Sequence, residues 1–222
     1  MNCPKAIPFL LLAFFGFVSL PADAQINLKT GYNFSLFSDD GLDNLITAYN
    51  ATQPYSTPFK RLRWLHGFET GLRFKADLHS LELSYQGGYQ TVKATGNSAN
   101  EEYTDKLRMG IHSFAIGYQA SDRKFGAGTD LQYQIYKVKF TPGQSPAIFK
   151  NTQDMFALKF YLMLTLQGQK GVDMALQPYY VLPFKTYDLQ PLASYLQTEP
   201  SGGRERWKRF GLTVLFYNGD KK

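Results

Sequence analysis

Hydrophobic and polar residues alternate with a period of two over most of the chain, and turn-like segments divide the alternation into eight runs. The runs cover residues 26–37, 63–76, 80–94, 106–120, 124–140, 155–167, 172–187 and 205–217. A period of two is typical of a strand whose two faces meet different surroundings. Every run exceeds the roughly 9 to 11 residues that a tilted strand needs to cross a bilayer. The pattern therefore predicts eight long β-strands.

The connections between the runs alternate strictly between short and long. The short ones are residues 77–79, 121–123 and 168–171, and the long ones are 38–62, 95–105, 141–154 and 188–204. This alternation places all long connections at one end and the short turns at the other, as in a bacterial outer-membrane barrel. We therefore predict an all-β fold, an eight-stranded antiparallel up-and-down transmembrane β-barrel. Residues 41–50 predict one or two helical turns over the barrel mouth, with an apolar face of Leu45, Ile46 and Tyr49.

One face of each run is suited to contact with hydrocarbon. In the sixth run the apolar parity holds Phe156, Leu158, Phe160, Leu162, Leu164 and Leu166. The first, second and eighth runs repeat the pattern with Leu28, Tyr32, Phe34 and Leu36, with Trp64, Phe68, Leu72 and Phe74, and with Phe210, Leu212, Val214 and Phe216. An Arg or Lys that faces lipid at the midplane costs roughly 2 to 4 kcal/mol. The near absence of charge from this parity indicates a lipid-facing surface.

The opposite parity carries seven charged side chains of both signs, which are Lys29, Glu69, Arg73, Glu82, Asp130, Lys159 and Arg209. The interior of an eight-stranded barrel is just wide enough for side chains to fill it. Buried charges must pair with one another to be tolerated. We therefore predict that these residues form an ion-pair network that fills the lumen. Small residues such as Gly71, Gly88, Gly128 and Gly211 would make room for it.

Two prolines, Pro178 and Pro183, interrupt the seventh run. A closed barrel has no free edge at which a missing N–H donor is harmless. We therefore expect a bulge or a locally unpaired position in this strand.

Residues 1–24 have the composition of a secretory signal peptide. Lys5 precedes an apolar stretch over residues 6–20, and Ala22 and Ala24 stand at the two small-residue positions before the predicted cleavage site. Cleavage would leave residues 25–222 as the barrel domain. The lone cysteine, Cys3, precedes the apolar stretch, which argues against attachment of a lipid to it.

Composition excludes several protein classes. The chain has 222 residues and a mean hydropathy of −0.30, so it is one domain and not a polytopic helical membrane protein. Its 18 Phe and 15 Tyr residues exclude a disordered chain. The net charge is +6, and the predicted export of the chain argues against nucleic acid as its partner.

In these features the chain resembles the small eight-stranded outer-membrane barrels of the OmpA and OmpX type, and in texture the outer-membrane barrels common in Bacteroidota. The resemblance is architectural, and it includes the segments Gly-Phe-Glu-Thr-Gly-Leu-Arg-Phe at 67–74 and Leu-Gln-Pro-Tyr-Tyr-Val-Leu-Pro-Phe at 176–184. It implies a location in the cell outer membrane. The implied partners are outer-membrane lipid and lipopolysaccharide, the barrel assembly machinery, and a surface protein or glycan bound by the long loops.

No constellation of residues predicts catalysis, a metal site or a cofactor. His112 stands beside Ser113, and His79 beside Ser80, but adjacent strand residues point to opposite faces and cannot form a base and nucleophile pair. The acidic loop of Asp39, Asp40 and Asp43 lacks the ligand spacing of an EF-hand.

The leading functional hypothesis is a structural or surface-interaction barrel whose four external loops present Tyr49, Tyr55, Tyr103, Phe149 and Tyr195. Three alternatives stay open. They are a narrow solute channel, an outer-membrane acyl hydrolase, and a soluble lipocalin-like barrel with its apolar parity turned inward.

Overall fold

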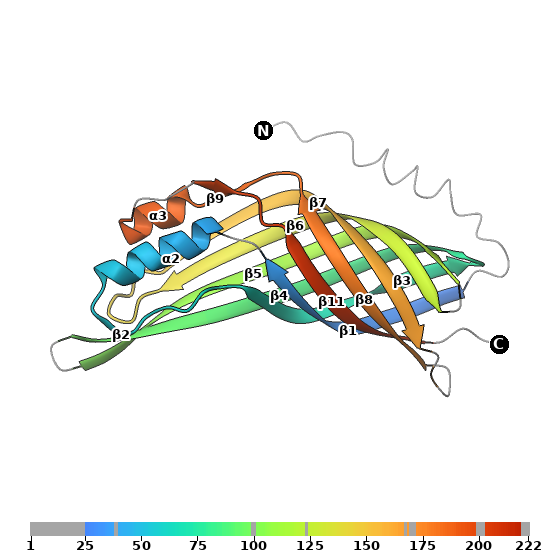
Figure 1. Ribbon diagram of the computed structural model, residues 1–222, viewed down its shortest axis with the longest axis horizontal. Coiled ribbons are helices and arrows are strands. Elements are labelled where there is room, and N and C mark those ends of the chain that lie inside the picture. The colour runs from blue at the N-terminus through green and yellow to red at the C-terminus, as the bar shows by residue number, and fades with distance from the viewer. Residues whose placement is uncertain are drawn as a thin grey trace.

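The computed structural model describes residues 25–37, 40–98, 101–122, 124–166, 168, 172–198 and 203–218. The predicted signal peptide, with Ala22 and Ala24, lies outside the described residues. Eight long strands build the fold (Figure 1). They are β1 (Gln25–Phe37), β3 (Trp64–Ala76), β4 (His79–Ser98), β5 (Glu101–Ser121), β6 (Phe125–Thr141), β7 (Phe149–Leu166), β8 (Val172–Pro183) and β11 (Arg209–Asn218).

The strands close into an antiparallel barrel. Their order is β4-β3-β1-β11-β8-β7-β6-β5, and pairing of β5 with β4 completes the circle. The first and last strands of the chain are neighbours, with Lys29 opposite Tyr217 and Phe37 opposite Arg209. The predicted eight-stranded up-and-down barrel is confirmed.

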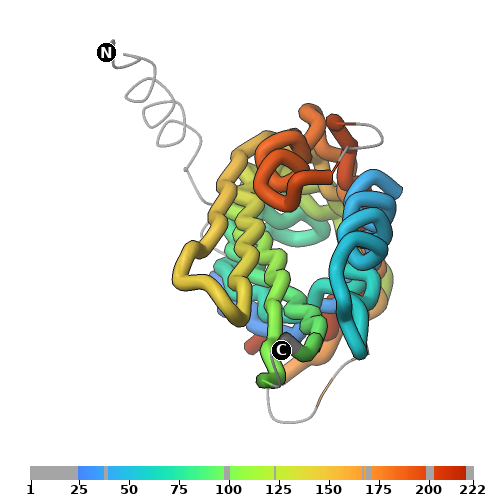
Figure 2. The backbone as a smooth tube through the Cα atoms, turned by 90° about the vertical axis from the view of Figure 1, so that its left-hand side faces the viewer, coloured from blue at the N-terminus to red at the C-terminus, as the bar shows by residue number. Residues whose placement is uncertain are grey.

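The barrel is much taller on one side than on the other (Figure 1). β4 and β5 have 20 and 21 residues, whereas β8 and β11 have 12 and 10. At the end that carries the long connections, β4 to β7 extend beyond the other strands. Two helices, α2 (Asp40–Thr52) and α3 (Gln190–Leu196), lie against the concave side of this extension (Figure 2). Three short strands accompany them, β2 (Tyr55–Thr57), β9 (Tyr187–Asp188) and β10 (Arg204–Glu205). Among the described residues, no helix is long and apolar enough to cross a membrane.

The prediction of a long loop at residues 95–105 is wrong. β4 continues to Ser98 and β5 begins at Glu101, and the two strands stay in register up to that pair. The polar composition of residues 95–105 favoured a loop over a continuation of the two strands. They form because β2 pairs with β4 at Gly96 and Thr95, and because Tyr55 packs on Tyr103 with ring centroids 6.1 Å apart.

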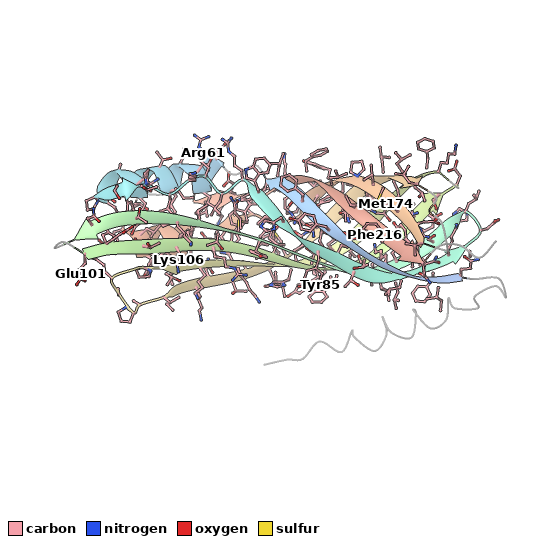
Figure 3. The ribbon with its side chains drawn as sticks, turned by 90° about the horizontal axis from the view of Figure 1, so that it is seen from below. Arg61, Tyr85, Glu101, Lys106, Met174 and Phe216 are labelled. Atoms are coloured by element: carbon pink, nitrogen blue, oxygen red, sulfur yellow. The ribbon has the colours of Figure 1, made fainter. Side chains whose placement is uncertain are left out.

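An apolar belt surrounds the barrel at the end with the short turns. Its members point outward and expose between a third and two thirds of their surface. They include Leu28, Tyr32, Phe68, Leu72, Leu81, Phe114, Ile116, Leu131, Phe156, Phe160, Leu162, Phe210, Leu212 and Phe216. Figure 3 shows Phe216 among these outward side chains. An apolar surface of this extent is typical of a face that contacts lipid or another protein.

Pro178 interrupts hydrogen bonding without shifting the register. Lys159 is opposite Val181 above the interruption and Leu164 is opposite Leu176 below it, and both pairs belong to one register. The ladder between β7 and β8 skips Leu162 and Met163. The structure therefore has the unpaired positions that we expected, and no bulge. β8 ends at Pro183, four residues before the predicted end at 187.

Candidate functional site

The lumen holds a buried cluster of five charged side chains, Lys29, Glu69, Glu82, Asp130 and Lys159, which we call the lumen plug. The Lys29 ammonium lies 3.0 Å from Glu69 Oε1 and 2.5 Å from Glu82 Oε2. None of the five exposes more than 2% of its surface. Their alternation along the strands places all of them on the inner face, where opposite charges compensate one another.

The plug reaches across the lumen through Lys159. Its ammonium lies 3.3 Å from Glu69 Oε2 and 3.6 Å from Asp130 Oδ2, and it donates a hydrogen bond of 3.2 Å to Gln177 Oε1. β3, which carries Glu69, and β7, which carries Lys159, stand on opposite sides of the barrel because three strands separate them in either direction. A contact between them therefore bridges the full width of the lumen.

A second bridge crosses the lumen between β4 and β8. Gln86 Nε2 of β4 donates a hydrogen bond of 3.1 Å to the Tyr179 hydroxyl of β8, again between opposite strands. Gly211 lies beneath the Tyr179 ring, and a Cβ at this glycine would overlap ring atoms of Tyr179. Gly128 accommodates Tyr161 in the same way. Gly128 and Gly211 therefore make room for tyrosine rings, whereas a Cβ at Gly71 would meet the neighbouring strand at Leu83 and Ser84.

The two arginines predicted for the network lie apart from it. The Arg73 guanidinium lies over the Tyr217 ring, 4.3 Å from the ring centroid, and Arg209 is buried nearer the loop end. Arg73 is the cross-strand partner of Glu82, but the Glu82 carboxylate turns to Lys29 instead. Within the described part of the chain, neither arginine forms an ion pair. The structure thus brings five of the seven predicted residues together.

Above the plug the interior becomes apolar. We call the described residues of 40–62 and 184–208 the cap, because they cover the inner face of the extended strands β4 to β7. Cap and strands share one hydrophobic core. Its members include Leu42, Leu45, Ile46, Phe59, Leu62, Leu107, Met109, Ile111, Val138, Phe140, Tyr187, Leu192 and Trp207. The Trp207 and Tyr187 rings stack with centroids 4.0 Å apart.

The predicted helix over the mouth is therefore present, and α2 buries Leu42, Leu45 and Ile46. The predicted display of loop aromatics is wrong for Tyr49, Tyr55 and Phe149, which pack against the core of the cap. Tyr195 is exposed, and its ring lies 5.0 Å from the Phe149 ring. Burying the three packed rings removes more apolar area from water than displaying them would.

Asp105 fastens the cap to β5. Its carboxylate accepts a hydrogen bond from the Tyr55 hydroxyl and one of 2.6 Å from the backbone N–H of Gly143. Burial, and after it the hydrogen bond to Asp105, raise the pKa of Tyr55 above its ordinary value. The proton therefore stays on the phenol, and Asp105 ties the first long connection and the connection between β6 and β7 to β5.

Asp43, in the first long connection, forms ion pairs within and beside the cap. Asp43 Oδ2 lies 3.4 Å from Arg61 Nε and 3.6 Å from a terminal nitrogen of Arg63. Asp39 lies outside the described residues. Among the described residues, no group of three or more His, Cys, Asp or Glu side chains is placed to hold a metal ion.

The histidines lie on the outer wall. His112 Nδ1 lies 2.6 Å from the Tyr85 hydroxyl, and His79 Nδ1 lies 2.6 Å from the Tyr118 hydroxyl. Ser113 and Ser80 are buried on the inner face. Each serine therefore points away from its neighbouring histidine, as the alternation of strand side chains requires.

The two faces of β5 exchange their chemistry near His112, which sequence reasoning missed. Nearer the short turns, Phe114 and Ile116 point outward and Ser113 points inward, whereas nearer the loop end Arg108 points outward and Met109 points inward. β6 changes in the same way. The signal in the sequence is basic residues spaced by two on the apolar parity, Lys106 with Arg108 and Lys137 with Lys139.

Comparison with known proteins supports the fold. No protein-family model matches the sequence, and no curated protein matches it. Among solved structures, the attachment invasion locus protein Ail of Yersinia pestis, in complex with the heparin analogue sucrose octasulfate, aligns with a TM-score of 0.51 at 11% identity. The alignment covers 87% of this chain and 98% of Ail. Neisserial surface protein A aligns with a TM-score of 0.42 at 10% identity, over 89% of this chain and 99% of that one.

The predicted resemblance to small eight-stranded outer-membrane barrels is confirmed at the level of the fold. The resemblance to Bacteroidota proteins stays a prediction.

Proposed function

We propose that this protein is an outer-membrane β-barrel with a closed lumen that acts through its loop end as a structural or surface-interaction protein. The contact between Lys159 and Glu69 across the lumen carries the proposal, because it joins buried side chains from opposite walls of the barrel. The outward apolar belt supports insertion into a membrane, because contact with hydrocarbon would remove this apolar surface from water.

The orientation follows from the connections. Short turns face the periplasm and long connections face the exterior in bacterial outer-membrane barrels. The cap would therefore stand outside the cell, with lipopolysaccharide around the belt. The barrel assembly machinery would insert the chain. A surface protein or glycan would meet the outer side of the cap, where α2, Arg61 and Arg63 are exposed.

The alternatives fit the geometry less well. A lipocalin-like barrel would hold apolar residues inward along its whole length, but here the inner face around the plug is polar. A solute channel would need an open path past both cross-lumen bridges. An acyl hydrolase would need His112 and Ser113 on one face.

The test combines gel migration with conductance. Residues 25–222 refolded into liposomes should migrate as a heat-modifiable band, and the same preparation should be electrically silent in planar bilayers. The heat-modifiable band proves that silence does not come from failed insertion. Steady, size-selective conductance would overturn the closed lumen, and an unshifted protein that stays in the aqueous fraction would overturn the membrane barrel.

A further inference from the structure

Six basic side chains gather on the outer wall of the extended strands, and we call them the basic wall. They are Lys93 on β4, Lys106 and Arg108 on β5, Lys137 and Lys139 on β6, and Lys150 on β7. All point outward, away from the apolar core of the cap. Figure 3 shows Lys106 on this wall, between Glu101 at the left-hand end of the strands and Tyr85 to the right.

The basic residues face one another directly across the strands. Lys93 is opposite Lys106, Arg108 is opposite Lys139, and Lys139 is opposite Lys150. Like charges at directly opposed positions destabilise a sheet. Among the described residues, none of the six forms an ion pair. The Arg108 guanidinium lies over the Tyr89 ring, 4.8 Å from the ring centroid. The wall therefore holds uncompensated positive charge that an anion would stabilise.

The acidic residues of this wall lie at its margins. Glu102 is exposed near the strand ends, and Asp154 accepts a hydrogen bond of 3.0 Å from the Tyr133 hydroxyl at the lower margin. Between these margins the wall carries only positive charge.

A hollow of about 340 Å³ opens within the wall. Its lining includes Tyr85, Tyr89, Arg108, Gly110, Lys137 and Lys150. Gly110 stands beside Lys137 at an outward position, and a Cβ there would meet only the Gly88 carbonyl oxygen, 3.8 Å away. The missing side chain therefore creates space between aromatic rings and basic groups.

The position of the wall identifies the ligand. A row of aromatic side chains crosses the same strands below it, with Tyr85 opposite Phe114, Phe114 opposite Tyr133, and Tyr133 opposite Phe156. Such a row is typical of the edge of the hydrocarbon layer. Lys137 and Lys139 follow Tyr133 on β6, about 10 to 15 Å higher for a strand rise of about 3.4 Å per residue and a tilt near 45°. This height is that of lipid headgroups and the sugars attached to them.

We propose that the basic wall binds the phosphates of a phosphorylated glycolipid of the outer leaflet, and that the hollow at Gly110 receives part of its headgroup. The inference rests on the proposed membrane barrel and names a fixed site for one class of surrounding lipid. Cations beside an aromatic row suit an anion whose acyl chains lie against the belt, whereas a soluble polyanion would gain nothing from the aromatic row.

The test compares three variants of the full barrel. K137Q/K139Q/K150Q removes three charges from the wall, and K60Q/K185Q/K208Q removes three exposed lysines from the cap at the same end. G110F fills the hollow without a change of charge. The probe is diphosphoryl lipid A, titrated into detergent-solubilised barrel and followed by native mass spectrometry. Lipid A without phosphates and inositol hexakisphosphate serve as comparison ligands.

We expect the wall variant to bind lipid A at least about tenfold more weakly, since each basic residue contributes to attraction toward an anionic surface. G110F should weaken binding as well, and the cap variant should bind as the unmodified protein does. Equal binding by the wall variant, or equal binding of dephosphorylated lipid A, would overturn the proposal. Binding of inositol hexakisphosphate to the wall without binding of lipid A would overturn it in favour of a soluble polyanion.

Gel migration and conductance of the same variants separate this inference from the proposed function. The three substituted lysines point outward and form no ion pair among the described residues, so K137Q/K139Q/K150Q should remain heat-modifiable and silent. If the wall variant binds lipid A as tightly as the unmodified protein does, and the unmodified barrel is silent and heat-modifiable, only the lipid site is refuted. A conducting or soluble unmodified protein sinks the proposed function, whatever the lipid titration shows.

Discussion

The Lys159 ammonium lies 3.3 Å from a carboxylate oxygen of Glu69, although β7 and β3 stand on opposite sides of the barrel. Glu69 also receives Lys29, so one carboxylate holds two buried ammonium groups. This makes Glu69 the centre of the lumen plug, and the consequences of its loss can be measured.

Glu69→Ala should lower the free energy of unfolding by about 3 to 5 kcal/mol, because it leaves two buried ammonium groups short of a partner. The measurement is the temperature at which the unboiled gel band converts to the unfolded position. Glu101→Ala, at an exposed position, is the control and should leave that temperature unchanged. An unchanged conversion temperature for Glu69→Ala would contradict the role of the plug.

Gly211→Ala should destabilise the barrel by about 1 to 3 kcal/mol, the usual cost of overpacking a filled interior. The added methyl group would overlap the Tyr179 ring, which Gln86 holds in place. Urea unfolding in liposomes measures the change. Gly110→Ala is the matched control, because its Cβ would meet only the Gly88 carbonyl oxygen at an ordinary contact distance of 3.8 Å, and equal stability losses for the two variants would refute the packing argument.

Trp207→Ala should loosen the cap while the barrel stays closed. Trp207 is 1% exposed and stacks on Tyr187, and truncation of such a ring costs about 3 to 5 kcal/mol. Limited proteolysis should cut the cap faster, with the heat-modifiable band retained. Trp64→Ala removes a ring that is 51% exposed and should leave the cleavage rate unchanged. Loss of the heat-modifiable band in Trp207→Ala would show that cap and barrel fold as one unit.

Alkaline pH should also loosen the cap. The raised pKa of Tyr55 means that its neutral form stabilises the fold fully below the unfolded pKa of tyrosine, near 10, and that this contribution is lost as the pH rises above that value. Cleavage of the cap should therefore accelerate above about pH 10. Tyr55→Phe should lose about 1 kcal/mol at neutral pH and show a weaker alkaline acceleration, whereas Tyr32→Phe, on the outer belt, should behave as the unmodified chain. Identical alkaline profiles for all three proteins would count against the bond to Asp105.

The fold was predictable because a period of two leaves only two faces for each side chain. Lys29 and Lys159 had to point inward once Leu28 and Phe160 were assigned to the lipid. Which carboxylate each would meet was not predictable, because Arg73 and Lys29 both lie within reach of Glu82 and only the packing of Tyr217 beside Arg73 separates them.

The cap could be predicted only in part. The apolar face of α2 is visible in the sequence, but its partners Leu107 and Val138 lie in runs whose other parity was assigned to lipid. Along β5 and β6 the polar and apolar faces exchange sides. The position of this exchange depends on where the lipid-facing surface ends, which strand periodicity alone does not predict. Long runs of alternation that gain outward Lys and Arg at one end are the signal to seek.

The unequal strand lengths determine how far the β4–β5 hairpin projects beyond the other strands. A strand of 20 residues such as β4 rises about 45 to 50 Å along the barrel axis at the usual rise and tilt, and the hydrocarbon accounts for only about 30 Å of that. The hairpin of β4 and β5 therefore projects beyond the other strands, and the cap packs against one of its faces. Each further pair of residues added to it would lift its tip by about 2.4 Å. The height of the tip above the rest of the barrel is thus set by the number of paired residues in β4 and β5.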